Sequence, residues 1–425
     1  MIRLTADRFA EPSDALSLRE QPLVVHQRVE PTVNDKLVIF VHGLGGGRYG
    51  TKSTWGNFPR FIFEDIPELD VGMYQYRTLK SRLHFTQSVS LQAEANVFAD
   101  IIRDQLANYT NIVLIGHSMG GLLCKAVIHR LVESGARNAL TRIGGLILMA
   151  TPQLGSMRIP GFLSMFSYDA RALKPHGEFV TKINRSFEDH IELDEKADTL
   201  RKETIPTWAV EGISDLWVDP LSSGIGLASS RRKVVRGSHT AIVKPSNKDA
   251  DAYMWVKERV EIALHRFKYD VFIAAAMAGT ADDAEYQEHR DAVLALIEVL
   301  KNNCNCPSVF YAGTSLPVKD AWDPKILALQ IDLQAMRESK NFILFFPKKI
   351  PSSVLYEAGW ALILGKPSIY ITPNDKELPF LLNDAGQAFP DQRVRIFKCA
   401  DREKMLKEVA SYGDKLFHYR ERLDL

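Results

Sequence analysis

Short, nearly continuous apolar runs alternate with longer amphipathic stretches along almost all of the 425 residues. The runs are rich in β-branched residues, as in the strands of a parallel sheet that is covered on both faces. The longer stretches, such as residues 91–106 and 120–132, repeat their apolar residues at helical spacing. This alternation predicts an α/β fold. The strands of the first series are expected at residues 36–41, 71–76, 111–116, 144–150, 207–212 and 233–236.

A second series of the same kind follows an amphipathic stretch at residues 252–267. Its five expected strands suit a smaller, doubly wound parallel sheet of the flavodoxin or Rossmann type. They lie at residues 269–276, 308–313, 341–347, 367–372 and 394–397, with helices that include residues 284–300 and 354–364.

The junction between the two series contains no Gly/Ser/Pro-rich linker, so we place a tight domain boundary near residues 266–268. The expected organisation is an N-terminal extension at residues 1–30, a first domain at 31–267 and a second at 268–425.

The charge balance of the chain excludes one broad class of partner. The 53 Lys and Arg residues face 52 Asp and Glu residues, which leaves a net charge of +1. Such a chain has no global electrostatic reason to bind nucleic acid or an acidic membrane. The N-terminus lacks the apolar core of a signal peptide, and no apolar run approaches the roughly 18 residues that span a bilayer. We therefore expect a cytoplasmic protein without a transmembrane segment and without a nucleic-acid partner.

The four cysteines, Cys124, Cys304, Cys306 and Cys399, are too few and too scattered for a disulfide framework. Cys304 and Cys306 form a lone C-x-C that lacks the second pair a zinc site needs. We expect reduced thiols here, with a metal at the C-x-C as the less favoured alternative. No metal or other cofactor is predicted.

A G-x-S-x-G pattern, Gly116 to Gly120, directly follows the expected strand 111–116 and precedes a helix. In this context the serine lies on a strained strand-to-helix turn, and the flanking glycines allow close packing of the backbone. The pattern predicts Ser118 as a catalytic nucleophile. The alternative is a serine that only caps the helix.

A nucleophilic serine needs a base and an orienting acid, which follow it in the order Ser, acid, His in this type of site. Asp215 comes just after the expected strand 207–212, and Asp219 and Glu211 are alternatives for the acid. His239 lies in the loop after strand 233–236, whereas His265 lies in an amphipathic stretch. We predict Asp215 as the orienting acid and His239 as the general base.

The same chemistry needs two N–H groups that stabilise an oxyanion. The N–H of Met119 directly follows the nucleophile, and the N–H of Leu44 lies in the glycine-rich loop 41–50. That loop has neither the spacing of a P-loop nor that of a dinucleotide-binding turn. We therefore predict the Leu44 and Met119 N–H groups as the oxyanion hole.

Four segments of the first domain, "VHGLGG", "GHSMGG", "MATPQLGS" and "SHTAIVKP", resemble the α/β-hydrolase family over roughly residues 30–265. They are most similar to its serine esterase and lipase-like members. The resemblance implies hydrolysis of an acyl ester, with a lipid ester among the candidates. Residues 157–175 are a candidate lid over an acyl pocket, or equally ordinary core.

In the second domain, Glu357 lies on the first turn of a helix that Ser352 or Ser353 is expected to cap. Gly359 and Ala361 keep the surface beside it small, and Gly365-Lys366-Pro367 ends the helix. A plain acid that complements the helix dipole is the alternative interpretation.

The segment "EAGWALILGKP" and the opening "YDVFIAAAMAGT" resemble nucleoside 2-deoxyribosyltransferases and TIR-like domains over residues 268–425. The resemblance implies that Glu357 is the carboxylate of an N-glycosidase that cleaves NAD or a nucleoside. It also implies a homo-oligomer, and fusions of this kind resemble bacterial antiphage effectors. Further candidate pocket residues are Tyr286, Arg290, Tyr311 and Asp332.

Two alternatives to a two-activity protein stay open. In one, a single domain is the enzyme and the other is only a module that senses a nucleotide or a lipid. In the other, neither domain turns over substrate and the chain is a regulatory scaffold.

Overall fold

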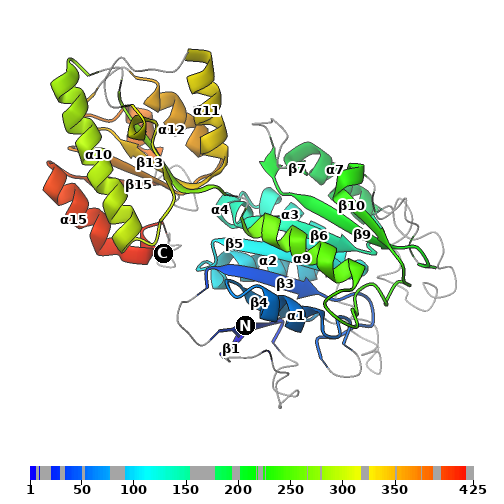
Figure 1. The fold of residues 1–425 in the computed structure, drawn as a ribbon. Helices are drawn as coiled ribbons and strands as arrows, with labels where there is room; N and C mark the ends of the chain where they lie inside the picture. The colour runs from blue at the N-terminus through cyan, green and yellow to red at the C-terminus, as the bar shows by residue number, and fades with distance from the viewer. Residues whose placement is uncertain are drawn as a thin grey trace. The chain divides into compact units, whose positions relative to one another are not determined.

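The computed structural model describes residues 1–5, 9, 21–28, 34–49, 53–76, 91–153, 178–193, 202–216, 218, 224, 226–265, 267–277, 280–316, 325–349, 352–374, 376–385 and 394–417. The chain divides into two compact units, unit 1 at Met1–His265 and unit 2 at Arg266–Leu425. Figure 1 follows the chain through both units, which are described separately below.

Unit 1 is built on an eight-stranded sheet in the order β1-β2-β4-β3-β5-β6-β9-β10. All neighbouring strands are parallel except β2 and β4, which are antiparallel. The bounds are β1 Ile2–Thr5, β2 Leu23–Gln27, β3 Lys36–Val41, β4 Asp70–Tyr74, β5 Asn111–His117, β6 Ile143–Met149, β9 Thr207–Gly212 and β10 Arg232–Val235. A separate short pair is formed by β7 (Ile191–Glu192) and β8 (Glu203–Thr204).

Helices cover both faces of this sheet. Successive side chains of each strand point to opposite sides, and apolar side chains on both sides need to be covered. Leu37 and Ile39 of β3 join the core under one set of helices, and Val38 and Phe40 join the core under the other. The first set is α2 (Leu91–Asp100), its π-helical continuation Ile101–Gln105, α3 (Met119–Glu133) and α7 (Glu178–His190). The second set is α1 (Phe58–Asp65) and α9 (Asp251–Leu264), and α9 lies in front of the sheet in Figure 1.

The strands expected at residues 36–41 and 207–212 form with those bounds, and the other four of the first series form with ends shifted by one or two residues. The segment predicted as an N-terminal extension, residues 1–30, contributes β1 and β2 to the sheet instead. Leu23, Val24 and Val25 of β2 are fully buried. This five-residue run carries no motif and is too short to assign from its apolar pattern alone.

Unit 2 contains five parallel strands in the order β12-β11-β13-β14-β15. Their bounds are β11 Tyr269–Ala275, β12 Val309–Phe310, β13 Ser339–Phe345, β14 Ser368–Thr372 and β15 Val394–Lys398. One face packs against α10 (Asp283–Asn303) and α15 (Arg402–Tyr412), and the other against α11 (Lys325–Arg337) and α12 (Val354–Ile363). In this doubly wound order the connections change direction between β11 and β13. Sheets of this type bind their ligands at such a point, beyond the carboxyl ends of the strands.

The strand expected at residues 308–313 is shorter in the structure and is followed by a 3₁₀ turn at Ala312–Thr314. A Cβ on Gly313 would lie 2.4 Å from the ring of Tyr311, and Arg290 Nε donates to the Gly313 carbonyl at 2.9 Å. The backbone turns here because the glycine packs against the tyrosine ring. The predicted fold class, an α/β-hydrolase sheet with a smaller parallel sheet, is confirmed.

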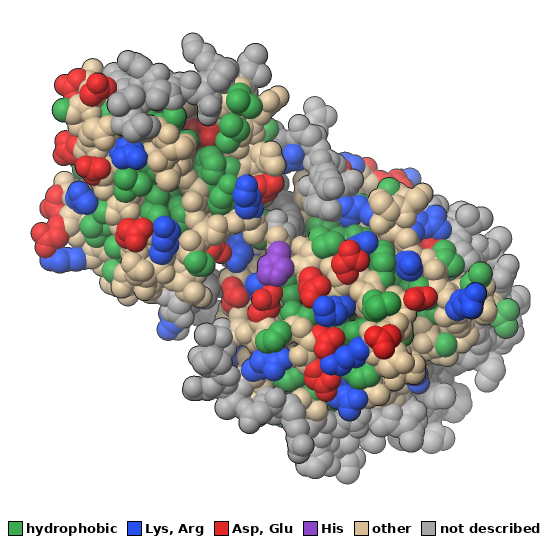
Figure 2. Space-filling view, viewed as in Figure 1, with side chains coloured by type: hydrophobic (Ala, Val, Ile, Leu, Met, Phe, Trp, Pro, Cys, Tyr) green, Lys and Arg blue, Asp and Glu red, His purple; other side chains and the backbone are tan. Residues whose placement is uncertain are grey.

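Acidic and basic side chains are interspersed over the face of unit 1 that Figure 2 presents. Among the helices that the structure describes, none is both long and apolar enough to cross a bilayer. The four cysteines are buried, and none of them forms a disulfide.

Candidate active site

Ser118 lies on a strained bend between β5 and α3. Its backbone has φ 54° and ψ −122°, a positive φ that a residue with a side chain rarely adopts. The bend needs its glycines, because a Cβ on Gly116 would lie 2.5 Å from the Gly121 Cα and one on Gly120 would lie 2.4 Å from the His42 carbonyl oxygen. The strand and helix are thus pressed together, and the serine is left half-buried at the carboxyl edge of the sheet.

Asp215 and His239 form a close pair at the same edge of the sheet. Asp215 follows β9, His239 follows β10, and His239 Nδ1 lies 2.8 Å from Asp215 Oδ2. The other carboxylate oxygen, Oδ1, accepts the Val218 N–H at 3.0 Å. Both side chains are largely buried, at 2% exposed for Asp215 and 13% for His239. Because Nδ1 faces the carboxylate, Nε2 is the ring nitrogen that is able to act as a base.

His239 lies beside the bend that carries Ser118. Its ring centroid is 4.7 Å from that of His117, and its carbonyl oxygen is 2.9 Å from His117 Nε2. The three predicted residues of the triad are therefore brought to the carboxyl ends of β5, β9 and β10.

The alternatives for the acid and the base lie in other environments. Glu211 is buried and forms an ion pair with Arg232 at 3.1 Å, so its charge is compensated there. His265 is 60% exposed and contacts Glu68 at 2.9 Å. Asp219 lies outside the described residues.

The loop after β3 carries the first predicted oxyanion donor. The Gly43 carbonyl accepts from the Gly46 N–H at 3.1 Å and from His42 Nδ1 at 2.8 Å. In a trans peptide the C=O and the following N–H point in opposite directions, so the Leu44 N–H points away from these two donors. A Cβ on Gly43 would lie 3.0 Å from Ser118 Cβ, which places this peptide against the nucleophile.

The second predicted donor, the Met119 N–H, belongs to the first residue of α3. The N–H of the first residue of an α-helix has no carbonyl partner within the helix, so the Met119 N–H is available to a ligand. Both predicted donors therefore border Ser118.

His42 holds the oxyanion loop, a role that the sequence did not reveal. Burial lowers the pKa of His42 to about 4, so the ring is neutral at physiological pH. Its Nδ1 donates to the Gly43 carbonyl, and its Nε2 accepts the Tyr76 N–H at 3.3 Å. The ring also stacks on Tyr76, with centroids 4.5 Å apart. The only sequence signal was the position of this histidine between a strand and Gly43.

Lys125 is a second residue that sequence reasoning missed. It lies two turns into α3, is 5% exposed, and donates to Gln153 Oε1 at 2.9 Å and to Asn184 Oδ1 at 2.6 Å. Burial lowers the pKa of this ammonium to about 7. Lys125 thus ties α7 and the residues after β6 to the helix that begins next to Ser118. The candidate lid, residues 157–175, lies outside the described residues.

Glu357 of unit 2 is buried on the first turn of α12, at 8% exposed. Burial, and secondarily the charge of Asp332 on α11, raises the pKa of Glu357 to about 8. Burial also raises the pKa of Asp332 to about 6. The charge of Asp332 therefore acts on Glu357, and both carboxyl groups hold a proton more readily than an ordinary carboxyl does.

The expected side-chain cap of this helix does not form. The N-cap residue is Ser353, but its side chain makes no cap hydrogen bond, and Ser353 Oγ lies 3.5 Å from Glu357 Oε1 instead.

The other candidate pocket residues of unit 2 hold the turn after β12. Tyr286 donates its hydroxyl to the Leu316 carbonyl at 2.7 Å, and Arg290 binds the carbonyl of Gly313. Tyr311 is buried beneath Gly313. The contacts of these three residues are accounted for by the packing of this turn.

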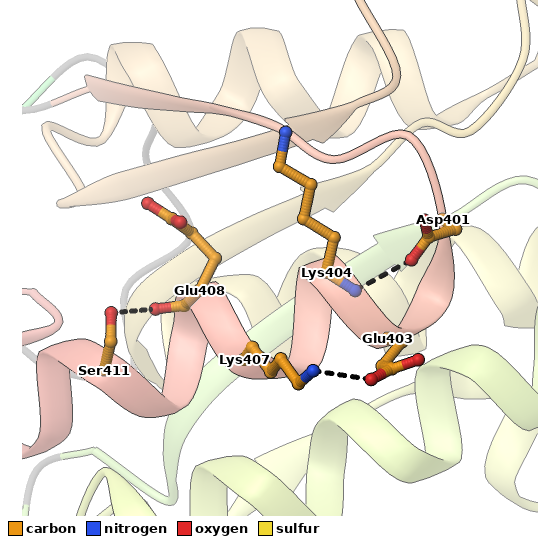
Figure 3. Close-up of a pocket in the computed structure, with 6 residues that line it drawn as sticks. All are labelled: Asp401, Glu403, Lys404, Lys407, Glu408 and Ser411. Atoms are coloured by element: carbon orange, nitrogen blue, oxygen red, sulfur yellow. Dashed lines mark hydrogen bonds and ion pairs between the residues drawn. The ribbon is translucent and has the colours of Figure 1, made fainter.

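Within the described part of the chain, no group of three or more His, Cys, Asp or Glu side chains is arranged to hold a metal. At the C-x-C, the Cys306 thiol donates to the Cys304 carbonyl oxygen at 3.3 Å. A charged surface recess on α15, shown in Figure 3, contains none of the predicted site residues. It is lined by Asp401, Glu403, Lys404, Lys407, Glu408 and Ser411.

Comparison with known proteins bears mainly on the fold of the first unit. No curated protein matches the chain in sequence. Similar solved structures include the phospholipase PlaB from Legionella pneumophila in complex with thio-NAD, with a TM-score of 0.40 and 14% identity over 54% of this chain and 59% of that one. Others are the mature lipase BlEst2 from Bacillus licheniformis (TM-score 0.37, 14% identity, 54% and 94% covered) and the CMP N-glycosidase BcmB from Clostridium botulinum (0.26, 19%, 33% and 98%). Residues 38–239 match the model of the alpha/beta hydrolase family. The N-terminal unit therefore has the α/β-hydrolase fold.

Proposed function

We propose that unit 1 hydrolyses acyl esters with Ser118 as the nucleophile. The observation that carries this proposal is the serine at positive φ, which lies beside a buried Asp–His pair joined at 2.8 Å. This is the arrangement that an acyl-transfer site needs, because a serine hydroxyl is a weak nucleophile without an adjacent base.

The proposed reaction has two halves. In the first, Ser118 Oγ attacks the ester carbonyl, His239 Nε2 takes the hydroxyl proton, and Asp215 stabilises the resulting imidazolium. The N–H groups of Leu44 and Met119 stabilise the oxyanion, and the alcohol leaves with the proton from His239. In the second half, His239 activates a water that attacks the acyl-enzyme, which releases the carboxylic acid and restores Ser118.

Hydrolysis of p-nitrophenyl esters of short and long acyl chains tests this proposal. We expect Ser118→Ala to abolish turnover, and Ser134→Ala to leave it unchanged. Ser134 is a matched control because it lies at the other end of α3, where its hydroxyl donates to the Leu131 carbonyl at 3.2 Å. Full turnover by Ser118→Ala would refute the role of this serine. The ratio of rates for long and short chains reports whether the substrate is lipid-like.

We also propose that unit 2 cleaves the N-glycosidic bond of NAD or a nucleoside. Support comes from two carboxyl groups with raised pKa values, Glu357 and Asp332, on two helices that cover the same face of a doubly wound sheet. The ionised carboxylate stabilises an oxocarbenium-like ribose, and the protonated one donates its proton to the leaving base. The C1′–N bond breaks with its electrons on the base, and water then adds to C1′ and returns a proton to the pair. Cationic nicotinamide is a good leaving group even without that proton.

Chromatography of NAD and CMP after incubation with the full-length chain tests the second proposal. Glu357 has the higher of the two raised pKa values, so it is the carboxyl that supplies the proton. Glu357→Gln keeps the shape of the side chain but has no such proton to give, so we expect loss of cleavage of CMP, whose leaving base is neutral. Glu403→Gln is the matched control, because Glu403 is 78% exposed on α15. If ester hydrolysis persists and Glu357→Gln changes nothing, unit 2 is a binding module instead.

A further inference from the structure

His117, the residue before the proposed nucleophile, contacts the main chain of the proposed base. It is 4% exposed and ends β5, and its Nε2 lies 2.9 Å from the His239 carbonyl oxygen. Its ring packs against the His239 ring at 4.7 Å and lies edge-on to Trp55 at 6.1 Å.

The partners of His117 determine where its proton is. A carbonyl oxygen only accepts hydrogen bonds, so Nε2 carries the hydrogen and donates it to His239. Burial lowers the pKa of His117 to about 3, which keeps the ring neutral, so Nδ1 bears a lone pair. This buried Nδ1 makes no hydrogen bond with any described residue. Nδ1 faces the oxyanion loop, where a Cβ on Gly43 would lie 2.9 Å from it.

We propose that His117 is a positioning residue, which uses its Nε2–H to hold the loop of His239 in register with the Ser118 bend. This inference rests on the proposed ester hydrolysis. Ser118 is fixed by the bend, but His239 comes from a separate loop after β10 and depends on contacts to reach it. The Asp215 contact orients the His239 ring, and the His117 contact fixes its backbone.

Stability alone does not explain a histidine at this position. A buried acceptor without a partner costs free energy that an apolar ring of similar size would avoid. The position therefore retains a polar ring at a cost to the fold, which is understandable if the donated hydrogen bond serves catalysis.

Two variants separate the donor from the ring. His117→Phe keeps a flat ring against His239 and removes the donor, whereas His117→Gln loses the ring but presents an Nε2–H to the same carbonyl. For His117→Phe we expect kcat for ester hydrolysis to fall roughly 10- to 100-fold, because a catalytic group that is displaced by about 1 Å loses rate on this scale. KM should stay unchanged, and the melting temperature should not fall. His117→Gln should recover most of kcat.

The downfield proton resonance of the Asp215–His239 hydrogen bond gives a readout that needs no substrate. We expect this resonance in the wild type and in His117→Gln, and its broadening or loss in His117→Phe. Wild-type kcat in His117→Phe, or equal kcat losses in both variants with lowered melting temperatures, would overturn the inference. If the wild type hydrolyses no ester, the proposed function fails, and the resonance alone still decides whether His117 positions His239.

Discussion

Replacing Glu357 by Gln should stabilise unit 2, and should do so more strongly as the pH rises. The ordinary pKa of this carboxyl is 4.5, and burial together with the charge of Asp332 raises it to about 8 in the folded chain. Between these values the folded state holds a proton that the unfolded state has released. The free energy of unfolding therefore falls as the pH rises through this window.

The size of the effect follows from the shift. Each pH unit above the unfolded pKa costs about 1.4 kcal/mol, so Glu357 destabilises unit 2 by roughly 3 kcal/mol at pH 7 and by less than about 1 kcal/mol at pH 5. Gln is neutral at every pH and avoids this cost. Glu357→Gln should thus slow the amide hydrogen exchange that requires unfolding of unit 2. The expected slowing is roughly 100-fold at pH 7 and only a few fold at pH 5.

Hydrogen exchange of the full-length chain, resolved by peptide mass spectrometry, measures this effect. The buried strands β13 and β14 report on unit 2, and β5 serves as an internal reference in unit 1. The exposed control Glu403→Gln should leave all three strands unchanged. Equal protection of β13 in wild type and Glu357→Gln at pH 7, or a gain that does not depend on pH, would refute the reasoning.

Three further outcomes are expected in unit 1. Asp215→Asn should lower kcat for esters roughly 10⁴-fold without unfolding the chain, because the amide selects the wrong histidine tautomer; circular dichroism and ester kinetics check both parts. Gly116→Ala should lower the free energy of unfolding by about 1–3 kcal/mol or more, because its Cβ would meet the Gly121 backbone at 2.5 Å, and denaturant titration measures this. Burial lowers the pKa of Lys125 to about 7, so above that pH the unfolded state binds more protons than the folded state does. The free energy of unfolding of the wild type should therefore rise between pH 7 and 9. Hydrogen exchange of β5 should show that Lys125→Met removes roughly 2 kcal/mol of this rise.

Features that depend on local sequence were predictable. Runs of β-branched apolar residues predicted the buried strands, and β3 at Lys36–Val41 and β9 at Thr207–Gly212 have the expected bounds. The bend at Ser118 was predictable because only glycines allow the chain to pack around it. The order of acid and base along the chain led to Asp215 and His239, which the structure places in contact.

Features that depend on contacts between distant segments were not predictable. Lys125 looks like a surface lysine of an amphipathic helix, and only the approach of α7 shows that it is buried. The role of His42 depends on its partners, Gly43 and the Tyr76 N–H, which together select its tautomer. The pairing of Asp332 with Glu357 joins two helices and has no sequence pattern of its own.

The central claim is that Ser118 is an activated nucleophile, and the site of reaction with a fluorophosphonate tests it most directly. Tryptic peptides of the labelled full-length chain should carry one phosphonate adduct, on the peptide that contains Ser118, and His239→Ala should prevent its formation. A folded wild-type chain that takes up no label at Ser118, or whose Ser118 is labelled equally fast without the imidazole of His239, would contradict the account.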